Sequence, residues 1–258
     1  MKVKVSVRCL ALRDVAADAI IVGVYEGNVP LTAEAAGVDA LCGGLLAQLV
    51  EKGEITGKLN EVVTLFPPSQ SVRKVVAVGL GAANKLDVEK LRQAAANGLK
   101  AAAKGKTKTI AAHVRGAGAS PIALQDAAAA LVEGAVLATY SYDALKSKPE
   151  EKALAELILL CAGPEAMCTI EQGTKRGLAV ATATNLARDL VNAPANHMTP
   201  THMADVAAKI AAECSLQCDI LERSDTERLG MGALLGVARG SAEPPKLIVL
   251  RYEGNPGG

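Results

Sequence analysis

The hydrophobic pattern of the chain switches repeatedly between short apolar runs and longer stretches with helical spacing. Val3, Val5 and Val7 alternate with polar residues, which is the pattern of a half-buried β-strand. The continuous apolar run at 18–25 is typical of a strand that is covered on both faces. The same reasoning predicts further strands at 62–66, 74–78, 107–114 and 154–161.

Between these strands, apolar residues recur at the spacing of an amphipathic helix. Helices are predicted at 37–52, 87–104 and 120–138, the last of them opened by Ser120 and Pro121. The buried stripes would consist of Leu41, Leu45, Leu46 and Leu49 in the first helix and of Leu91, Ala94, Ala95 and Leu99 in the second. Strands that alternate with helices predict an α/β fold with a largely parallel sheet.

A second unit is predicted after a polar, charged zone at 140–152. We therefore expect two domains, residues 1–165 and 166–258, with a linker helix at 165–190 and another helix that starts at Thr199-Pro200. Strands are expected at 216–221 and 246–251, on either side of a glycine-rich segment at 229–240. The second unit would be incomplete, and we expect exposed apolar side chains at four positions, Val237, Leu247, Val249 and Leu250.

Composition narrows the class of protein further. Half of the residues are hydrophobic, but the chain has one Phe, four Tyr and no Trp, so the core must be aliphatic. The net charge of +1 gives no indication of nucleic acid or an anionic membrane as a partner. No secretory signal and no apolar run of membrane-spanning length is found, so we expect a cytoplasmic protein. Its six cysteines are then predicted to be reduced and mostly buried.

Several residues that could carry chemistry are better explained structurally. Gly79 and Gly81 follow a strand as in a dinucleotide fingerprint, but Asn84 stands at the third glycine position, which favours a simple tight turn. His197 and His202 straddle Thr199-Pro200 and cannot share a helical face as zinc ligands.

The remaining candidates are also weak. Cys214 and Cys218 have a permissible zinc spacing without a matching second pair, and His113 is isolated in a strand. No Gly-x-Ser-x-Gly motif is present. Lys100, Lys104, Lys106 and Lys108 form a basic patch without a neighbouring aromatic residue, which favours a solvated helix end.

The most informative segment runs from 185 to 196 and reads Asn-Leu-Ala-Arg-Asp-Leu-Val-Asn-Ala-Pro-Ala-Asn, followed by Thr199-Pro200. Physically it is a helix that ends in a turn, with Asn192 and Asn196 available to backbone groups and Pro194 stopping the helix. The pattern resembles the entry to the peptidase domain of the leucyl aminopeptidase family. The segments 230–241 and 244–252 resemble the small-residue segment and strand that follow, and 76–81 with 140–148 resembles the family's amino-terminal domain.

The resemblance implies an amino-terminal macrodomain-like α/β domain followed by the beginning of an α/β peptidase domain. It also implies a cytoplasmic metallopeptidase, a homohexamer in which two divalent ions, zinc or manganese, polarise the peptide carbonyl and activate water. Proteolysis would release amino-terminal residues, preferably Leu, from peptide substrates.

The family's metal-ligand motifs, Gly-Lys-Gly-x-x-x-Asp and Asn-Thr-Asp-Ala-Glu-Gly-Arg, do not occur in this sequence. We therefore assign no catalytic, cofactor-binding or metal-binding residue, and we expect this chain to bind no metal ion and to be inactive by itself. The alternatives are a stand-alone macrodomain-like module that binds nucleotides or ADP-ribose, and an assembly module.

Overall fold

The computed structural model describes residues 3–27, 30–67, 72–114, 122–148 and 154–254. The chain divides into two compact units, Met1–Asn185 and Leu186–Gly258. The domain boundary was expected at residue 165, at the start of the long helix α5, Pro164–Asn192. The contacts within the chain instead group most of this helix with the first unit, which extends to Asn185.

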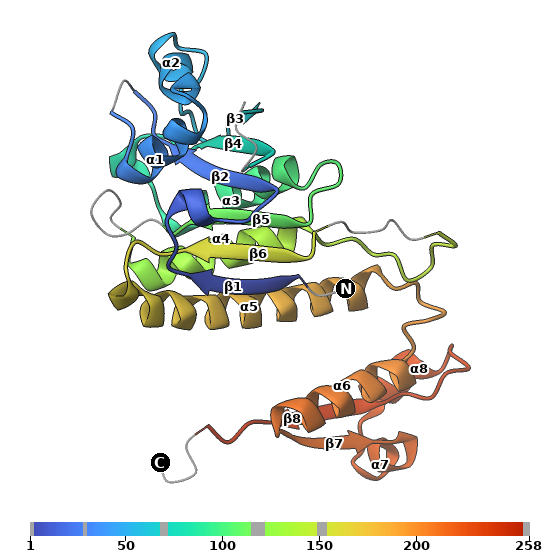
Figure 1. Ribbon diagram of the computed structural model, residues 1–258. Coiled ribbons are helices and arrows are strands. Elements are labelled where there is room, and N and C mark those ends of the chain that lie inside the picture. Colours follow the sequence, from blue (N-terminus) through green and yellow to red (C-terminus); the bar gives the residue numbers. More distant parts are fainter. Residues whose placement is uncertain (1–2, 28–29, 68–71, 115–121, 149–153, 255–258) are drawn as a thin grey trace. The chain divides into compact units, whose positions relative to one another are not determined.

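A six-stranded sheet forms the centre of the first unit (Figure 1). Its strand order is β1-β6-β5-β2-β4-β3, and every neighbouring pair is parallel except β3 and β4. The predicted α/β fold with a largely parallel sheet is therefore confirmed. The strands are β1 (Lys4–Arg8), β2 (Ala19–Val24), β3 (Val62–Leu65), β4 (Lys74–Gly79), β5 (Thr109–His113) and β6 (Glu156–Leu160).

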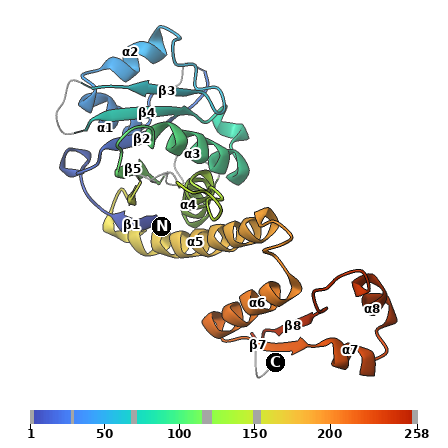
Figure 2. The ribbon, with the colours of Figure 1, turned by 90° about the vertical axis from the view of Figure 1, so that its right-hand side faces the viewer.

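Helices cover both faces of this sheet (Figures 1 and 2). Successive strand residues point to opposite faces, so Val76 and Val78 of β4 join one core while Val75 and Ala77 join the other. The first core includes side chains of α3, α4 and α5, and the second includes those of α1 and α2. These helices are α1 (Ala33–Leu41), α2 (Leu45–Glu51), α3 (Val88–Ala102), α4 (Leu124–Ala138) and α5.

Two predicted helices differ from the observed ones. The helix expected at 37–52 is broken into α1 and α2, which are bent by 117° at the break. Gly43 and Gly44 lie there with φ values of 64° and 83°, a left-handed conformation that glycine adopts readily. Helix α4 begins at Leu124, with Ala123 as its N-cap, while Ser120 and Pro121 lie outside the described residues. In the described part of the chain no single helix meets the length and apolarity of a membrane span, although the bent pair α1–α2 meets that criterion when combined.

Helix α3 confirms its prediction closely. Leu91, Ala94, Ala95 and Leu99 are all buried, and the Asp87 side chain accepts a hydrogen bond from the Lys90 backbone N at 2.8 Å. Asp87 is thus the N-cap, which satisfies one of the free N–H groups of the first turn.

Glycines allow α3, α4 and α5 to pack with their backbones close together. A Cβ on Gly134 of α4 would lie 2.3 Å from the Arg92 carbonyl oxygen of α3. A Cβ on Gly173 of α5 would lie 2.2 Å from the Gln125 carbonyl oxygen of α4. No side chain fits at either position without a shift of the neighbouring helix.

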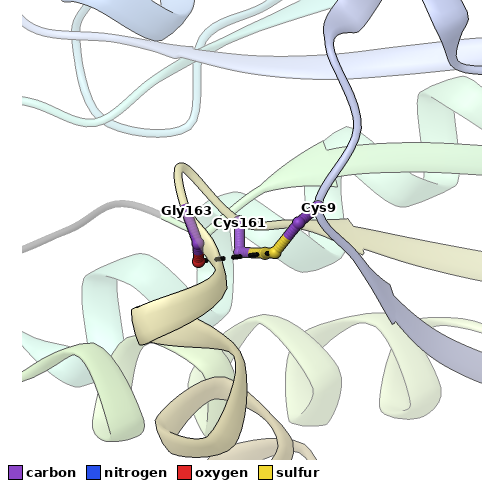
Figure 3. The surroundings of a disulfide bond; sticks show 3 residues. All are labelled: Cys9, Cys161 and Gly163. Carbon is purple, nitrogen blue, oxygen red and sulfur yellow. Dashed lines mark hydrogen bonds between the residues drawn. A yellow bond between two sulfur atoms is a disulfide. The ribbon is translucent and has the colours of Figure 1, made fainter.

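The parallel pairing of β1 with β6 brings two cysteines together. Arg8 is the register partner of Leu160, and the next residues on each strand, Cys9 and Cys161, form a disulfide with a Cα–Cα distance of 5.0 Å (Figure 3). The Gly163 carbonyl oxygen lies 3.4 Å from the Cys9 sulfur.

The prediction that all six cysteines are reduced is therefore wrong for this pair. Residues 152 positions apart become neighbours only through the sheet register, which the local sequence does not reveal. The prediction that most cysteines are buried is also wrong, because Cys42 is buried but Cys168 and Cys214 are exposed and Cys218 is half-buried.

The second unit contains α6 and a two-stranded antiparallel sheet in which Ile220 pairs with Ile248. The Thr199 hydroxyl accepts a hydrogen bond from the His202 backbone N at 3.2 Å, so the predicted N-cap is confirmed. Two short helices, α7 and α8, were not predicted, and α8 lies within the glycine-rich segment. The elements are α6 (Pro200–Cys214), β7 (Gln217–Leu221), α7 (Arg223–Arg228), α8 (Gly232–Ala238) and β8 (Leu247–Arg251).

Candidate functional site

The segment that carries the family resemblance forms a corner that is held by backbone hydrogen bonds. Helix α5 ends at Asn192, and the backbone N atoms of His197 and Met198 both donate to the Pro194 carbonyl oxygen, at 2.8 and 2.9 Å. The turn leads directly into the N-cap at Thr199. This geometry fits the structural role expected of the corner, and the His197 side chain is exposed.

The hairpin that follows α6 is stabilised by charge pairs. Lys246, the residue before β8, pairs with Glu222, and Arg251 pairs with Asp219 at 3.3 Å. Glu222 also opens α7, where its backbone N donates to the Asp225 carboxylate at 3.1 Å. This hydrogen bond, together with Arg228, holds the pKa of Asp225 below its ordinary value. Asp219, Glu222 and Asp225 are thus committed to local pairs and caps.

Apolar side chains are exposed on the second unit. Val237 is 88 % exposed and Leu250 is 43 % exposed, as predicted, and Leu229 and Tyr252 are exposed as well. Leu247 and Val249, which were also expected to be exposed, are instead half-buried.

The residues that the structure describes do not fit a two-metal centre. Among the described residues, no group of three or more His, Cys, Asp and Glu side chains lies close enough to hold a metal ion. Cys214 is exposed, Cys218 is half-buried, and the His202 backbone takes part in the helix cap. We therefore derive no step of a metal-dependent reaction from these side chains.

The carboxyl edge of the large sheet contains a small cavity of about 40 Å³ beside His113. The Nε2 atom of His113 is buried and has no hydrogen-bond partner within the described part of the chain. Burial holds the pKa of His113 below its ordinary value, and Glu34 opposes this shift. A cavity of this size accommodates a few water molecules but not a nucleotide.

The neighbouring glycines form the tight turn expected from the sequence. Gly81 has a φ of 72°, and a Cβ on Gly79 would lie 1.8 Å from the Lys58 carbonyl oxygen. The glycines are therefore required by a close backbone approach within the fold, which leaves no need for a dinucleotide to explain them.

Comparison with known proteins identifies the family. Residues 21–149 match the model of the N-terminal domain of the cytosol aminopeptidase family, and residues 185–257 match the model of its catalytic domain. This chain belongs to the cytosol aminopeptidase family. The family membership predicted from the corner and the strands around it is confirmed. The α/β fold is confirmed as an amino-terminal domain with the start of a peptidase domain.

The relatives are similar over nearly the whole of this chain. A probable cytosol aminopeptidase from Nitrosococcus oceani is 40% identical over 244 residues, which cover 93% of this chain and 48% of the relative. A probable cytosol aminopeptidase from Bacillus subtilis is 34% identical over 92% of this chain and 47% of its own length. The chain thus spans about half the length of the curated relatives it matches.

Two solved proteins are similar to this chain in fold and sequence. The bottromycin maturation enzyme BotP has a TM-score of 0.74 and 33% identity, covering 92% of this chain and 46% of BotP, and it has also been solved in complex with Mn. A tomato leucine aminopeptidase variant has a TM-score of 0.81 and 27% identity, covering 96% of this chain and 50% of the tomato chain.

Proposed function

We propose that this chain provides the amino-terminal domain and the first catalytic-domain elements of an aminopeptidase that releases amino-terminal residues from peptides. The observation that carries the proposal is the match to both family models, in the family's order along one chain. The corner at Pro194 and the capped helix α6 support it, because they stand at the start of the region matched by the catalytic model.

The finer parts of the proposal concern specificity, metals and assembly. We infer a preference for Leu at the peptide amino terminus, two divalent ions, zinc or manganese, a homohexameric assembly and a cytoplasmic location. The relatives' name, cytosol aminopeptidase, and the Mn complex of BotP support the location and the metal dependence.

We assign the chemistry to residues other than those of this chain. The first unit would take part in the assembly of the homo-oligomer. The second unit would provide α6, β7 and β8 as a scaffold within the catalytic domain. Neither metal-ligand motif of the family occurs in the sequence, and no acidic cluster is present among the described side chains. Without bound ions, both water activation and carbonyl polarisation are lost, so the chain alone should not turn over substrate.

The test compares two proteins. One is the 258-residue chain, and the other is a chimera that joins it to the part of the Nitrosococcus oceani catalytic domain beyond the matched region. Both are assayed with Leu-p-nitroanilide in the presence of Mn²⁺ or Zn²⁺. We expect turnover by the chimera that a chelator abolishes, and no measurable turnover by the chain alone.

Circular dichroism and gel filtration establish that the chimera is folded. A folded chimera that hydrolyses no aminoacyl substrate would contradict the proposed activity. Metal-dependent turnover by the 258-residue chain would instead contradict the assignment of the chemistry to other residues.

A further inference from the structure

A second cavity, of about 370 Å³, lies within the first unit at the amino-terminal end of β4. Its lining includes Thr64, Phe66, Arg73, Lys74, Lys104 and Lys106. Its volume lies within the range of small-molecule sites, which starts at about 300 Å³. The cavity is distinct from the one at His113, because β4 begins at Lys74 and ends at the opposite edge of the sheet.

The antiparallel pairing of β3 with β4 assembles part of this cavity. Leu65, the last residue of β3, is the register partner of Val75, so the residue that follows it, Phe66, lies beside Lys74. The segment after α3 adds Lys104 and Lys106. The basic patch predicted at 100–108 as a solvated helix end therefore lies beside an aromatic ring, which the sequence alone did not indicate.

The lining of the cavity carries an excess of positive charge. Four of its residues are cationic and none is acidic, and none of these four forms an ion pair with a residue in the described ranges. The nearby carboxylate of Asp18 already accepts hydrogen bonds from the backbone N atoms of Lys108 and Thr109. A concave surface lined by one sign of charge attracts an ion of the opposite sign.

Lys74 provides the strongest reason to expect an anion. It is only 5% exposed, and its Nζ donates to the Lys104 carbonyl oxygen at 2.6 Å. An ammonium group has three donors, and burial of an ammonium is unfavourable unless it is paired. Burial, followed by the charge of Arg73, holds the pKa of Lys74 below its ordinary value, although Asp18 opposes this. An anion in the cavity would supply the missing partner.

Phe66 provides a second and independent reason to expect a ligand in this cavity. It is the chain's single Phe and is 71% exposed, an unusual environment for an apolar ring. An exposed aromatic ring next to cationic side chains can stack on a planar ring of a ligand while the cations hold its phosphate.

We propose that the cavity bounded by Phe66, Arg73, Lys74, Lys104 and Lys106 binds small phosphate esters that carry a planar ring, with mononucleotides as the ligand class. Lys74, Arg73, Lys104 and Lys106 hold the phosphate, and Phe66 stacks on the base. A single aromatic ring and a cavity of about 370 Å³ fit one nucleotide rather than an extended strand, which requires a series of stacking platforms. The site is independent of the proposed aminopeptidase activity.

Calorimetric titration of the 258-residue chain with 5′-AMP and, separately, with inorganic phosphate tests this assignment. We expect saturable binding of 5′-AMP about 10-fold or more tighter than that of phosphate, since one stacked base contributes on that scale. Phe66→Ala should abolish this difference and leave phosphate binding unchanged. The double variant Lys104→Gln/Lys106→Gln should weaken both ligands about 10-fold or more.

Lys100→Gln is the matched control, because Lys100 is exposed on α3 and does not line the cavity. It should leave both affinities unchanged, and thermal melting verifies that every variant is folded. Absence of saturable 5′-AMP binding at millimolar concentration would overturn the proposal. Equal affinity for 5′-AMP and phosphate, or an equal loss in Lys100→Gln, would also overturn it, as would binding of oligonucleotides alone.

Discussion

Arg92 of α3 and Glu133 of α4 form an ion pair between two packed helices, with Nε 2.6 Å from Oε2. Glu133 is 8% exposed, and Arg92 also pairs with Glu89 one turn earlier on its own helix. The carbonyl oxygen of Arg92 lies against Gly134, the residue that follows Glu133. A charge pair and a backbone approach therefore define the same helix crossing.

Removal of Arg92 should leave a buried carboxylate without its partner. We expect Arg92→Met to lower the free energy of unfolding by about 1–3 kcal/mol, the cost of an unsatisfied buried group. The double variant Arg92→Met/Glu133→Gln should lose less than the sum of the two single changes, because the residues are coupled. Urea unfolding measures the free energy of unfolding of the two single variants and the double variant.

Arg176→Met serves as control, since its pair with Asp126 is exposed and should contribute at most about 1 kcal/mol. Additive losses in the double variant would disprove the coupling.

Gly134→Ala should separate α3 from α4. The added Cβ would lie 2.3 Å from a backbone oxygen, which cannot rotate away as a side chain can. We expect a loss of about 1–3 kcal/mol in the same urea experiment, although alanine favours helices over glycine. Lys175→Ala, on an exposed position of α5, should stay within about 0.5 kcal/mol of the unsubstituted chain. A Gly134→Ala variant as stable as this control would show that the helices do not approach so closely.

The Cys9–Cys161 disulfide should stabilise the first unit by constraining its unfolded chain. Dithiothreitol or Cys9→Ser should therefore lower stability by about 2–4 kcal/mol, measured as a lower unfolding midpoint. Cys168→Ser should change nothing, because Cys168 is a free and exposed thiol. In denaturant without reductant, four of the six cysteines should react with a thiol reagent. Reaction of all six under these conditions would mean that the bond does not form.

Asp18 should make the first unit sensitive to acid. Burial raises the pKa of this carboxyl, but hydrogen bonds from the backbone N atoms of Lys108 and Thr109, together with the positive charges of Arg73 and Lys108, outweigh it, so the folded pKa lies below the ordinary 3.8. The resulting stability is fully present above pH 3.8 and is lost as the pH falls through the lower folded value. Asp18→Asn should lose about 1–2 kcal/mol at neutral pH and show a smaller further loss in acid. Parallel pH profiles of both proteins would contradict this role of Asp18.

Much of the secondary structure could be predicted because its signals are local. The stripe of Leu91, Ala94, Ala95 and Leu99 is buried as expected, since helical spacing alone places these side chains on one face. The same periodicity did not reveal the helix break at Gly43 and Gly44, because backbone conformation rather than side-chain pattern ends the helix there. The corner at Pro194 was also recognisable from its residues, because its hydrogen bonds connect near neighbours.

From the amino-acid pattern alone we could infer the alternation of strands and helices, the aliphatic character of the core and, through the corner and the segments around it, the family. The order of the strands became visible only in the folded chain, and so did the Cys9–Cys161 bond and the position of Phe66 beside Lys74 and Lys104. This division arises because side-chain spacing controls which face of an element is buried, whereas strand order and register depend on packing between segments far apart in the chain.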